Sequence, residues 1–170
     1  MDKEYFLDKG ILYLEGILTR EVAVETIRLL HLLEESHYHE EIRIYVALEN
    51  AQLPAALMLG DVIRNMKTKV KTYAISYLVG YSSFVFLAGH ERVALAHSVI
   101  NFPRFDFSIE GNKIELINFN NYTDKVKKNM RDTYIECTGQ EPFEEFLTED
   151  RFMKAQEMLE KNVATEVIGG

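Results

Sequence analysis

Hydrophobic and polar residues follow a repeating order of strand and then helix through the first half of the chain. An apolar run that ends at Gly16 predicts a first strand, and Thr19 can cap a helix after it. The alternation over residues 42–46 predicts a second strand, and Pro54 suits the first turn of the next helix. The first of these helices has an apolar stripe at helical spacing, formed by Ala23, Ile27, Leu30 and Leu33.

The same order continues with a third strand over residues 70–76, a buried helix over 80–88 and a fourth strand over 92–100. Strand and helix therefore alternate at least three times. This rhythm predicts an α/β fold in which helices pack on a largely parallel sheet. A length of 170 residues without a linker or low-complexity stretch predicts a single domain over residues 1–170.

The second half has a different pattern. Residues 105–109 and 114–116 alternate on either side of Glu110-Gly111-Asn112, which predicts a hairpin. Thr123 can cap a long helix whose end is marked by Gly139. The remaining segments predict helices over 141–147 and 152–161 and a closing strand over 163–168.

Composition excludes several classes of function. A net charge of −8 opposes binding to nucleic acid, because the attraction to phosphate is missing. No apolar run approaches the ~18 residues that span a bilayer, so we expect no membrane segment. Cys137 is the single cysteine and fits a reducing compartment, hence the cytoplasm. No Gly-rich phosphate loop is present, and we expect no cofactor.

The order of these segments and their local residues resembles the proteolytic subunit of the Clp protease, a member of the crotonase-like superfamily. The resemblance extends from about Gly10 to Ile168. It implies the repeated strand–helix units of that fold, with a handle region that contains a hairpin and a long helix here. The residues that carry it are Leu12 to Gly16, Glu21 to Ala23, Ile42 to Val46, Phe84 to Gly89, Leu95 with Ser98, Thr138 to Gln140, and Asp150 to Phe152 with Ala155 and Glu157.

The resemblance implies a serine nucleophile and a histidine base that this chain lacks. The run Leu78 to Ser82 corresponds to the family's nucleophile segment, and the alignment puts Gly80 at the nucleophile. The alignment through Leu95 and Ser98 puts Pro103 at the base. Glycine has no group that can attack a carbonyl, and proline cannot accept a proton. Of the three triad positions only Asp150 is retained, and a carboxylate without a base to orient does no chemistry.

The oxyanion-binding turn implied by the resemblance is also altered. Leu48 to Ala51 corresponds to a Ser-Pro-Gly-Gly turn whose backbone N–H helps to hold the oxyanion. Asn50 and Ala51 replace both glycines, and Glu49 adds negative charge near a site that must stabilise one. We therefore expect a degenerate site with at most weak residual catalysis.

Other serines and histidines offer a relocated active site as an alternative. Ser82 and Ser83 are candidate nucleophiles, with His97 or His90 as base. Successive helical residues are about 100° apart, so both serines should point away from the Gly80 direction. We interpret them as helix-packing residues.

Three further features can be interpreted either as functional sites or as ordinary structural and surface residues. His31, His37 and His39 suggest a metal site, but the nearby carboxylates have no recognisable ligand spacing, so we expect none. The Cys137 thiol has no obvious activating neighbour and is interpreted as packed. The basic run is interpreted as a solvated helix face, with a contact surface as the alternative; it contains Lys125, Lys127, Lys128 and Arg131.

These observations favour a non-catalytic Clp-type subunit that acts as a homo- or hetero-oligomer, with a heptameric ring as the form implied by the resemblance. The amino-terminal segment that forms axial loops in that family is reduced to about nine residues, so unfoldase docking through those loops is not expected. Glu149 stands where an arginine of an inter-ring ion pair would be, which makes ring stacking less certain than ring formation. The alternatives are an active serine-type peptidase or other crotonase-like hydrolase, and a stand-alone oligomeric binding scaffold.

Overall fold

The computed structural model describes residues 6–36, 38–106 and 112–169 of the chain. The described strands are β1 (Ile11–Leu18), β2 (Glu41–Ala51), β3 (Lys69–Ala74), β4 (Tyr77–Leu78), β5 (Glu91–Leu95), β6 (Val99–Phe102), β7 (Arg151–Lys154) and β8 (Glu166–Ile168). The described helices are α2 (Arg20–Ser36), α3 (Leu53–Asn65), α4 (Ser82–Leu87), α5 (Lys113–Thr138) and α6 (Ala155–Glu160).

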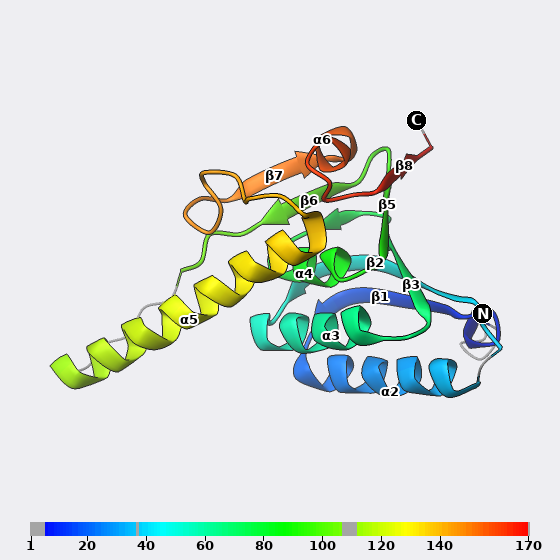
Figure 1. Cartoon of the computed structure of the whole chain (residues 1–170), viewed down its shortest axis with the longest axis horizontal. Helices are drawn as coiled ribbons and strands as arrows, with labels where there is room; N and C mark the ends of the chain where they lie inside the picture. The colour runs from blue at the N-terminus through cyan, green and yellow to red at the C-terminus, as the bar shows by residue number, and fades with distance from the viewer. Residues whose placement is uncertain (1–5, 37, 107–111, 170) are drawn as a thin grey trace.

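The main sheet has five parallel strands in the order β1-β2-β3-β5-β8. Helices α2 and α3 lie along one side of it (Figure 1). The strands bury alternate residues against these helices, as in β2, where Ile42, Ile44 and Val46 are fully buried. The predicted α/β fold with a largely parallel sheet is therefore confirmed.

The opposite face of the main sheet carries a row of tyrosines. Tyr13, Tyr45 and Tyr73 occupy neighbouring strands and stack with ring centroids 5.0 and 4.6 Å apart. Tyr13 at the edge keeps about half of its surface exposed. This face is therefore aromatic but not closed by a helix layer among the described residues.

A smaller sheet with the order β4-β6-β7 stands beside the main one. Strands β4 and β6 are parallel, with Leu78 opposite Ile100, and β7 runs antiparallel to β6, with Arg151 opposite Phe102. The single fourth strand predicted over 92–100 is therefore wrong. A turn in which the Ser98 N–H donates to the Leu95 carbonyl (2.8 Å) divides it into β5 and β6, which belong to different sheets.

Helix α5 replaces the second arm of the predicted hairpin. The first arm falls largely on residues 107–111, outside the described residues, but residues 114–116 are helical. Asn112 caps the helix, its side chain accepts from the Ile114 and Glu115 N–H groups, and the Glu115 side chain completes the capping box. The predicted cap at Thr123 is wrong because its hydroxyl donates within the helix to Asn120.

The end of α5 is as predicted. Gly139 adopts φ +67° and its N–H donates to the Ile135 carbonyl at 2.7 Å, a left-handed helix end that glycine favours. The amino-terminal half of α5 extends away from the body of the molecule, while its other half packs beside the small sheet (Figure 1). The described helices include none that is long and apolar enough to cross a membrane.

Of the two helices predicted near the carboxyl end, the one over 141–147 is wrong, and the one over 152–161 is confirmed only in its later part. Residues 144–148 form turns, with Leu147 at φ +67°. Residues 152–154 belong to strand β7, and only 155–160 are helical. Pairing with β6 fixes β7 as a strand, because tertiary hydrogen bonding overrides local propensity.

Candidate functional site

The end of the small sheet brings three predicted site positions and the end of β2 into one region. Gly80 follows β4 and Pro103 follows β6, and these strands are parallel neighbours, so both residues leave the sheet at the same end. Asp150 precedes β7, which runs antiparallel to β6, and so returns to that end. The end of β2 adjoins it, because the Val79 N–H lies 3.5 Å from the Leu48 carbonyl. We call this region the site edge.

Gly80 occupies a position that favours glycine. Its φ is +64°, in the left-handed region that residues with a Cβ rarely adopt. A Cβ placed on it would lie 2.5 Å from the Asn50 Oδ1. Its N–H donates to the Asn101 Oδ1 at 3.1 Å. The residue at the predicted nucleophile position is therefore in contact with two asparagine side chains and offers no side-chain group of its own.

Asn50 also holds the predicted oxyanion position. Its Oδ1 accepts from the Ala51 N–H at 2.8 Å, so this backbone donor already has a partner inside the chain. Residues 48–51 belong to β2 rather than to a free turn. The Asn50 side chain thus contacts both the nucleophile position and the oxyanion position.

Pro103 and Asp150 lie close together. The Asp150 Oδ1 accepts from the N–H of Arg104, the residue after Pro103, at 3.0 Å. Arg104 in turn forms an exposed ion pair with Asp106 at 2.9 Å. Asp150 is exposed, and its described hydrogen bond goes to a backbone N–H rather than to an imidazole. The carboxylate at the third triad position serves to hold a loop here.

Asn101 is a residue of the site edge that sequence reasoning missed. It is 4% exposed and lies in β6, and within the described part of the chain its Nδ2 has no hydrogen-bond partner. A buried amide donor without a partner costs about 1–3 kcal/mol. The signal that could have found it is a polar residue in the otherwise apolar strand 99–102.

Ser82 and Ser83 are both fully buried at the start of α4. The Ser82 hydroxyl donates to the Val79 carbonyl at 2.6 Å, and the Ser83 hydroxyl donates to the Gly80 carbonyl at 3.2 Å. Both hydroxyl protons are thus held by backbone oxygens rather than by a base. The interpretation of these serines as helix-packing residues agrees with this geometry.

The histidines proposed as alternative bases are engaged elsewhere or exposed. His90 Nδ1 accepts from the Val70 N–H at 2.9 Å, which makes Nε2 the donor to the Arg64 carbonyl at 3.3 Å. Val70 lies at the start of β3, whereas Ser82 follows its end, so His90 and the serines are at opposite ends of that strand. His97 is exposed in the turn between β5 and β6.

Two other titratable groups have altered pKa values because they are buried. Burial, followed by the nearby Asp106 charge, raises the pKa of Tyr81, which follows Gly80. Burial also raises the pKa of the Cys137 thiol, which the guanidinium groups of Arg64 and Arg92 only partly oppose. Neither group is activated as a nucleophile, and Cys137 is packed against the core as predicted.

The predicted solvated face of α5 is observed. Lys125, Lys127, Lys128 and Arg131 are all exposed. Lys128 pairs with Asp132 at 3.3 Å on the same helix.

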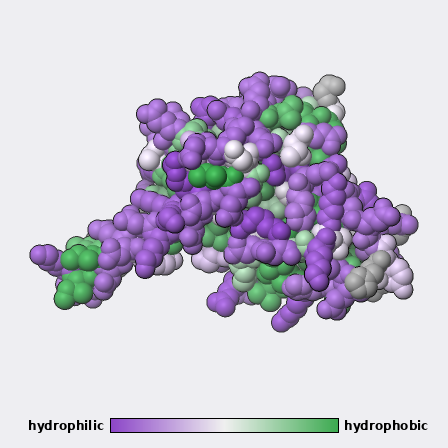
Figure 2. All heavy atoms as spheres, in the orientation of Figure 1, coloured by the Kyte–Doolittle hydropathy of each residue, from purple (hydrophilic) through white to green (hydrophobic). Residues whose placement is uncertain are grey.

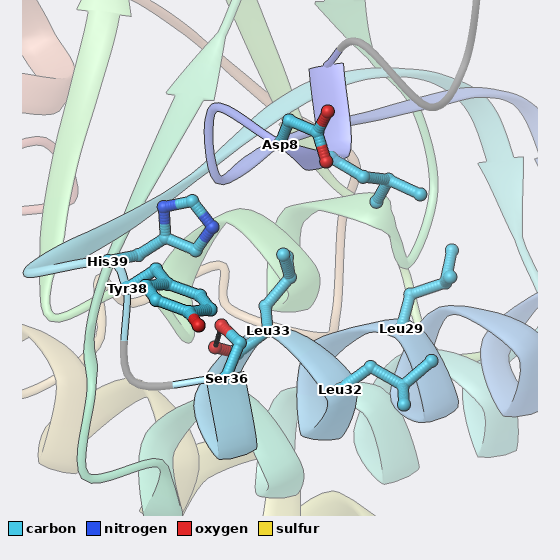
Figure 3. A pocket seen from close by; sticks show the side chains of 8 residues that line it. Asp8, Leu29, Leu32, Leu33, Ser36, Tyr38 and His39 are labelled. Atoms are coloured by element: carbon cyan, nitrogen blue, oxygen red, sulfur yellow. Dashed lines mark hydrogen bonds between the residues drawn. The ribbon is translucent and has the colours of Figure 1, made fainter.

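His39, one of the three histidines considered as metal ligands, lines a hollow of about 430 Å³. Leu29, Leu32 and Leu33 of α2 form one wall, with Tyr38 and His39 at one end and Asp8 opposite (Figure 3). His37 lies outside the described residues.

Over residues 6–36, 38–106 and 112–169, no three His, Cys, Asp or Glu side chains are grouped so that they could hold a metal ion. The hollow adjoins the start of β2 and is thus remote from the site edge.

The fold and the site edge together define an α/β protein with a parallel main sheet, a small accessory sheet and a projecting helix. The family model described as Clp protease matches residues 2–170, nearly the whole chain. The chain therefore belongs to the Clp protease family.

Proposed function

We propose that this protein is a non-catalytic Clp-type subunit that acts through ring assembly, either mixed with an active proteolytic subunit or alone. The observation that carries the proposal is the Gly80 environment. The position that the family resemblance gives to the nucleophile has a bare Cα at φ +64°, with the Asn50 side chain against it.

Acyl transfer requires groups that this chain lacks at the site edge, which supports the proposal. A serine nucleophile requires a base that takes its proton, and a charged intermediate requires free N–H donors. Pro103 cannot act as the base, and the Ala51 N–H is bonded to Asn50. Asp150 remains, but an orienting carboxylate acts only through an imidazole.

Assembly is supported by the family and by the shape of the chain. Members of the Clp protease family generally form oligomeric rings. The projecting half of α5 exposes four large apolar side chains: Ile114, Leu116, Ile117 and Tyr122. Figure 2 shows an apolar patch at the tip of this helix. Apolar side chains that a single chain leaves in water are typical of a surface that a partner covers. The single Cys137 supports a cytoplasmic location for such an assembly.

Co-assembly with an active Clp proteolytic subunit of the same organism tests the proposal. The two purified chains are mixed, and native mass spectrometry gives the composition of each ring. We expect rings that contain both chains and whose peptidase activity falls as the share of this chain rises. Rings of this chain alone would refute the mixed form and support the homomeric form of the proposal, and a monomer under all mixing ratios would refute assembly.

A further inference from the structure

The Asn50 carboxamide makes two contacts that have different consequences. Its Oδ1 accepts the Ala51 N–H at 2.8 Å, and the same atom lies 2.5 Å from the place a Cβ on Gly80 would occupy. One oxygen atom therefore uses both the hydrogen-bond donor and the space beside the Gly80 Cα.

A bulge in β2 turns Asn50 toward Gly80. The pairing with β1 is regular up to Gly16 opposite Leu48, and it resumes with Ile17 opposite Asn50, so Glu49 is the extra residue. Before the bulge even-numbered residues of β2 are buried, and after it Ala51 is buried while Asn50 is exposed. Bulges re-aim side chains in this way. Without the extra residue, position 50 would face the helices.

We propose that Asn50 is a built-in occupant of the site edge: its Oδ1 takes the Ala51 N–H that an acyl oxygen would use, and it fills the space that a side chain on residue 80 would use. This inference rests on the proposed function and deepens it. The site is closed by Asn50 as well as emptied by the loss of two catalytic side chains.

Asn50 has an advantage over a substrate carbonyl in the competition for the Ala51 N–H. Its carboxamide oxygen is a carbonyl acceptor, the same type of atom as the oxygen of a peptide bond. It is attached to the residue next to the donor, so it needs no association from solution, whereas a peptide must give up translational freedom to bind. A substrate carbonyl must therefore displace an intramolecular partner before it can reach Ala51.

A double-mutant cycle tests whether Asn50 fills the space beside the Gly80 Cα. Gly80→Ala is made in the natural chain and in Asn50→Gly, and Gly139→Ala is the matched control, since Gly139 has φ +67° and a Cβ there would meet nothing within 4 Å. We expect Gly80→Ala to lower the melting temperature more in the natural chain than in Asn50→Gly, and Gly139→Ala to lower it equally in both. Equal losses for Gly80→Ala in the two backgrounds would overturn the inference.

The hydrogen bond is tested by amide exchange at Ala51. Asn50→Gly removes the side-chain oxygen that accepts from the Ala51 N–H. We therefore expect this amide to exchange faster with solvent in Asn50→Gly than in the natural chain, with Gly139→Ala unchanged. An unchanged exchange rate in Asn50→Gly would show that Asn50 does not hold this donor and would overturn the inference.

The consequence for chemistry is tested by restoring the missing groups. Gly80→Ser with Pro103→His is compared with the same pair plus Asn50→Gly, using a fluorophosphonate probe. The introduced hydroxyl attacks phosphorus, the introduced imidazole takes its proton, and fluoride leaves. One oxyanion donor is worth about 10²–10³ in rate, so we expect the triple variant to label about a hundredfold faster. Equal rates, including no labelling of either variant, would overturn the inference.

These results are distinct from the test of the proposed function. Asn50→Gly changes no residue of the projecting half of α5, so we expect its assembly to match that of the natural chain. Labelling of the unmodified chain would contradict the proposed function, whereas equal labelling of the double and triple variants contradicts only the role of Asn50.

Discussion

The projecting half of α5 gives the sharpest prediction about assembly. We consider the pair of substitutions Ile114→Gln and Ile117→Gln. Ile114 is 71% exposed and Ile117 is 49% exposed, so the isolated chain gains little from either side chain. Glutamine forms helices at least as well as isoleucine, which leaves the helix itself intact.

The expected effect on association follows from the exposed fractions. Fully burying an isoleucine side chain contributes about 1.5–3 kcal/mol. If a partner covers what is now exposed, the two residues together contribute about 2–3.5 kcal/mol, because the exposed fractions are 71% and 49%. That range corresponds to an increase of about 30- to 400-fold in the dissociation constant of the assembly.

The assay has two parts. Native mass spectrometry across a dilution series gives the dissociation constant, and urea unfolding of the dissociated chain gives its stability. We expect the free energy of unfolding to change by less than about 0.5 kcal/mol, as for other exposed positions. Lys125→Gln is the matched control for association, because Lys125 is exposed on the same helix. Met130→Gln is the contrast for stability, because Met130 is fully buried.

Two results would refute this reasoning. An unchanged dissociation constant in the double variant would show that no partner covers the tip of α5. A loss of more than about 1 kcal/mol in the stability of the dissociated chain would show that the two isoleucines already pack within it, since exposed substitutions rarely cost so much.

Three other predictions concern stability. Arg92 is 5% exposed and its guanidinium donates to three backbone carbonyls, so Arg92→Met should cost about 3 kcal/mol or more in urea unfolding. The matched change Arg104→Met, at an exposed arginine, should cost under about 0.5 kcal/mol. Similar losses in the two variants would contradict a stabilising role for the Arg92 hydrogen bonds. Asn112→Ala should lower helical ellipticity by fraying the projecting end of α5 and leave the urea midpoint nearly unchanged; a clear midpoint shift would contradict this. Hydrogen bonds from the backbone N–H groups of Thr68 and Lys67 lower the pKa of Glu34. The stability it adds is therefore present above the ordinary glutamate pKa of about 4.3 and is lost as the pH falls through the lowered pKa; the stability curves of the natural chain and Glu34→Gln should converge in acid, and parallel curves would contradict this.

The repeating strand–helix order was predictable because it depends on local periodicity and on caps. Thr19 accepts from the Val22 N–H at 3.4 Å, and Pro54 lies in the first turn of α3, as expected from the sequence. The errors fall where pairing between distant segments decides the structure. Strand β7 exists because it pairs with β6, and no local pattern shows that partner. The start of α5 was missed because its apolar residues face solvent, so the usual link between periodicity and burial fails there.

The candidate site was predictable as a set of positions but not as a set of contacts. Gly80, Pro103 and Asp150 are far apart in the sequence, and their meeting at the site edge follows from the strand order of the small sheet. The role of Asn50 depends on a bulge that shifts the register of β2 by one residue. The sequence contains Glu49 and Asn50, but it does not show which of them is the extra residue in the strand.

The central claim, that this chain has no activated serine, is tested most directly by the mass of the intact natural protein after exposure to a fluorophosphonate probe. An active Clp proteolytic subunit, labelled to completion in the same tube, serves as the control. We predict that the mass of this chain stays unchanged, because both Ser82 and Ser83 are buried and donate to backbone carbonyls. A stoichiometric adduct on either serine would contradict the account.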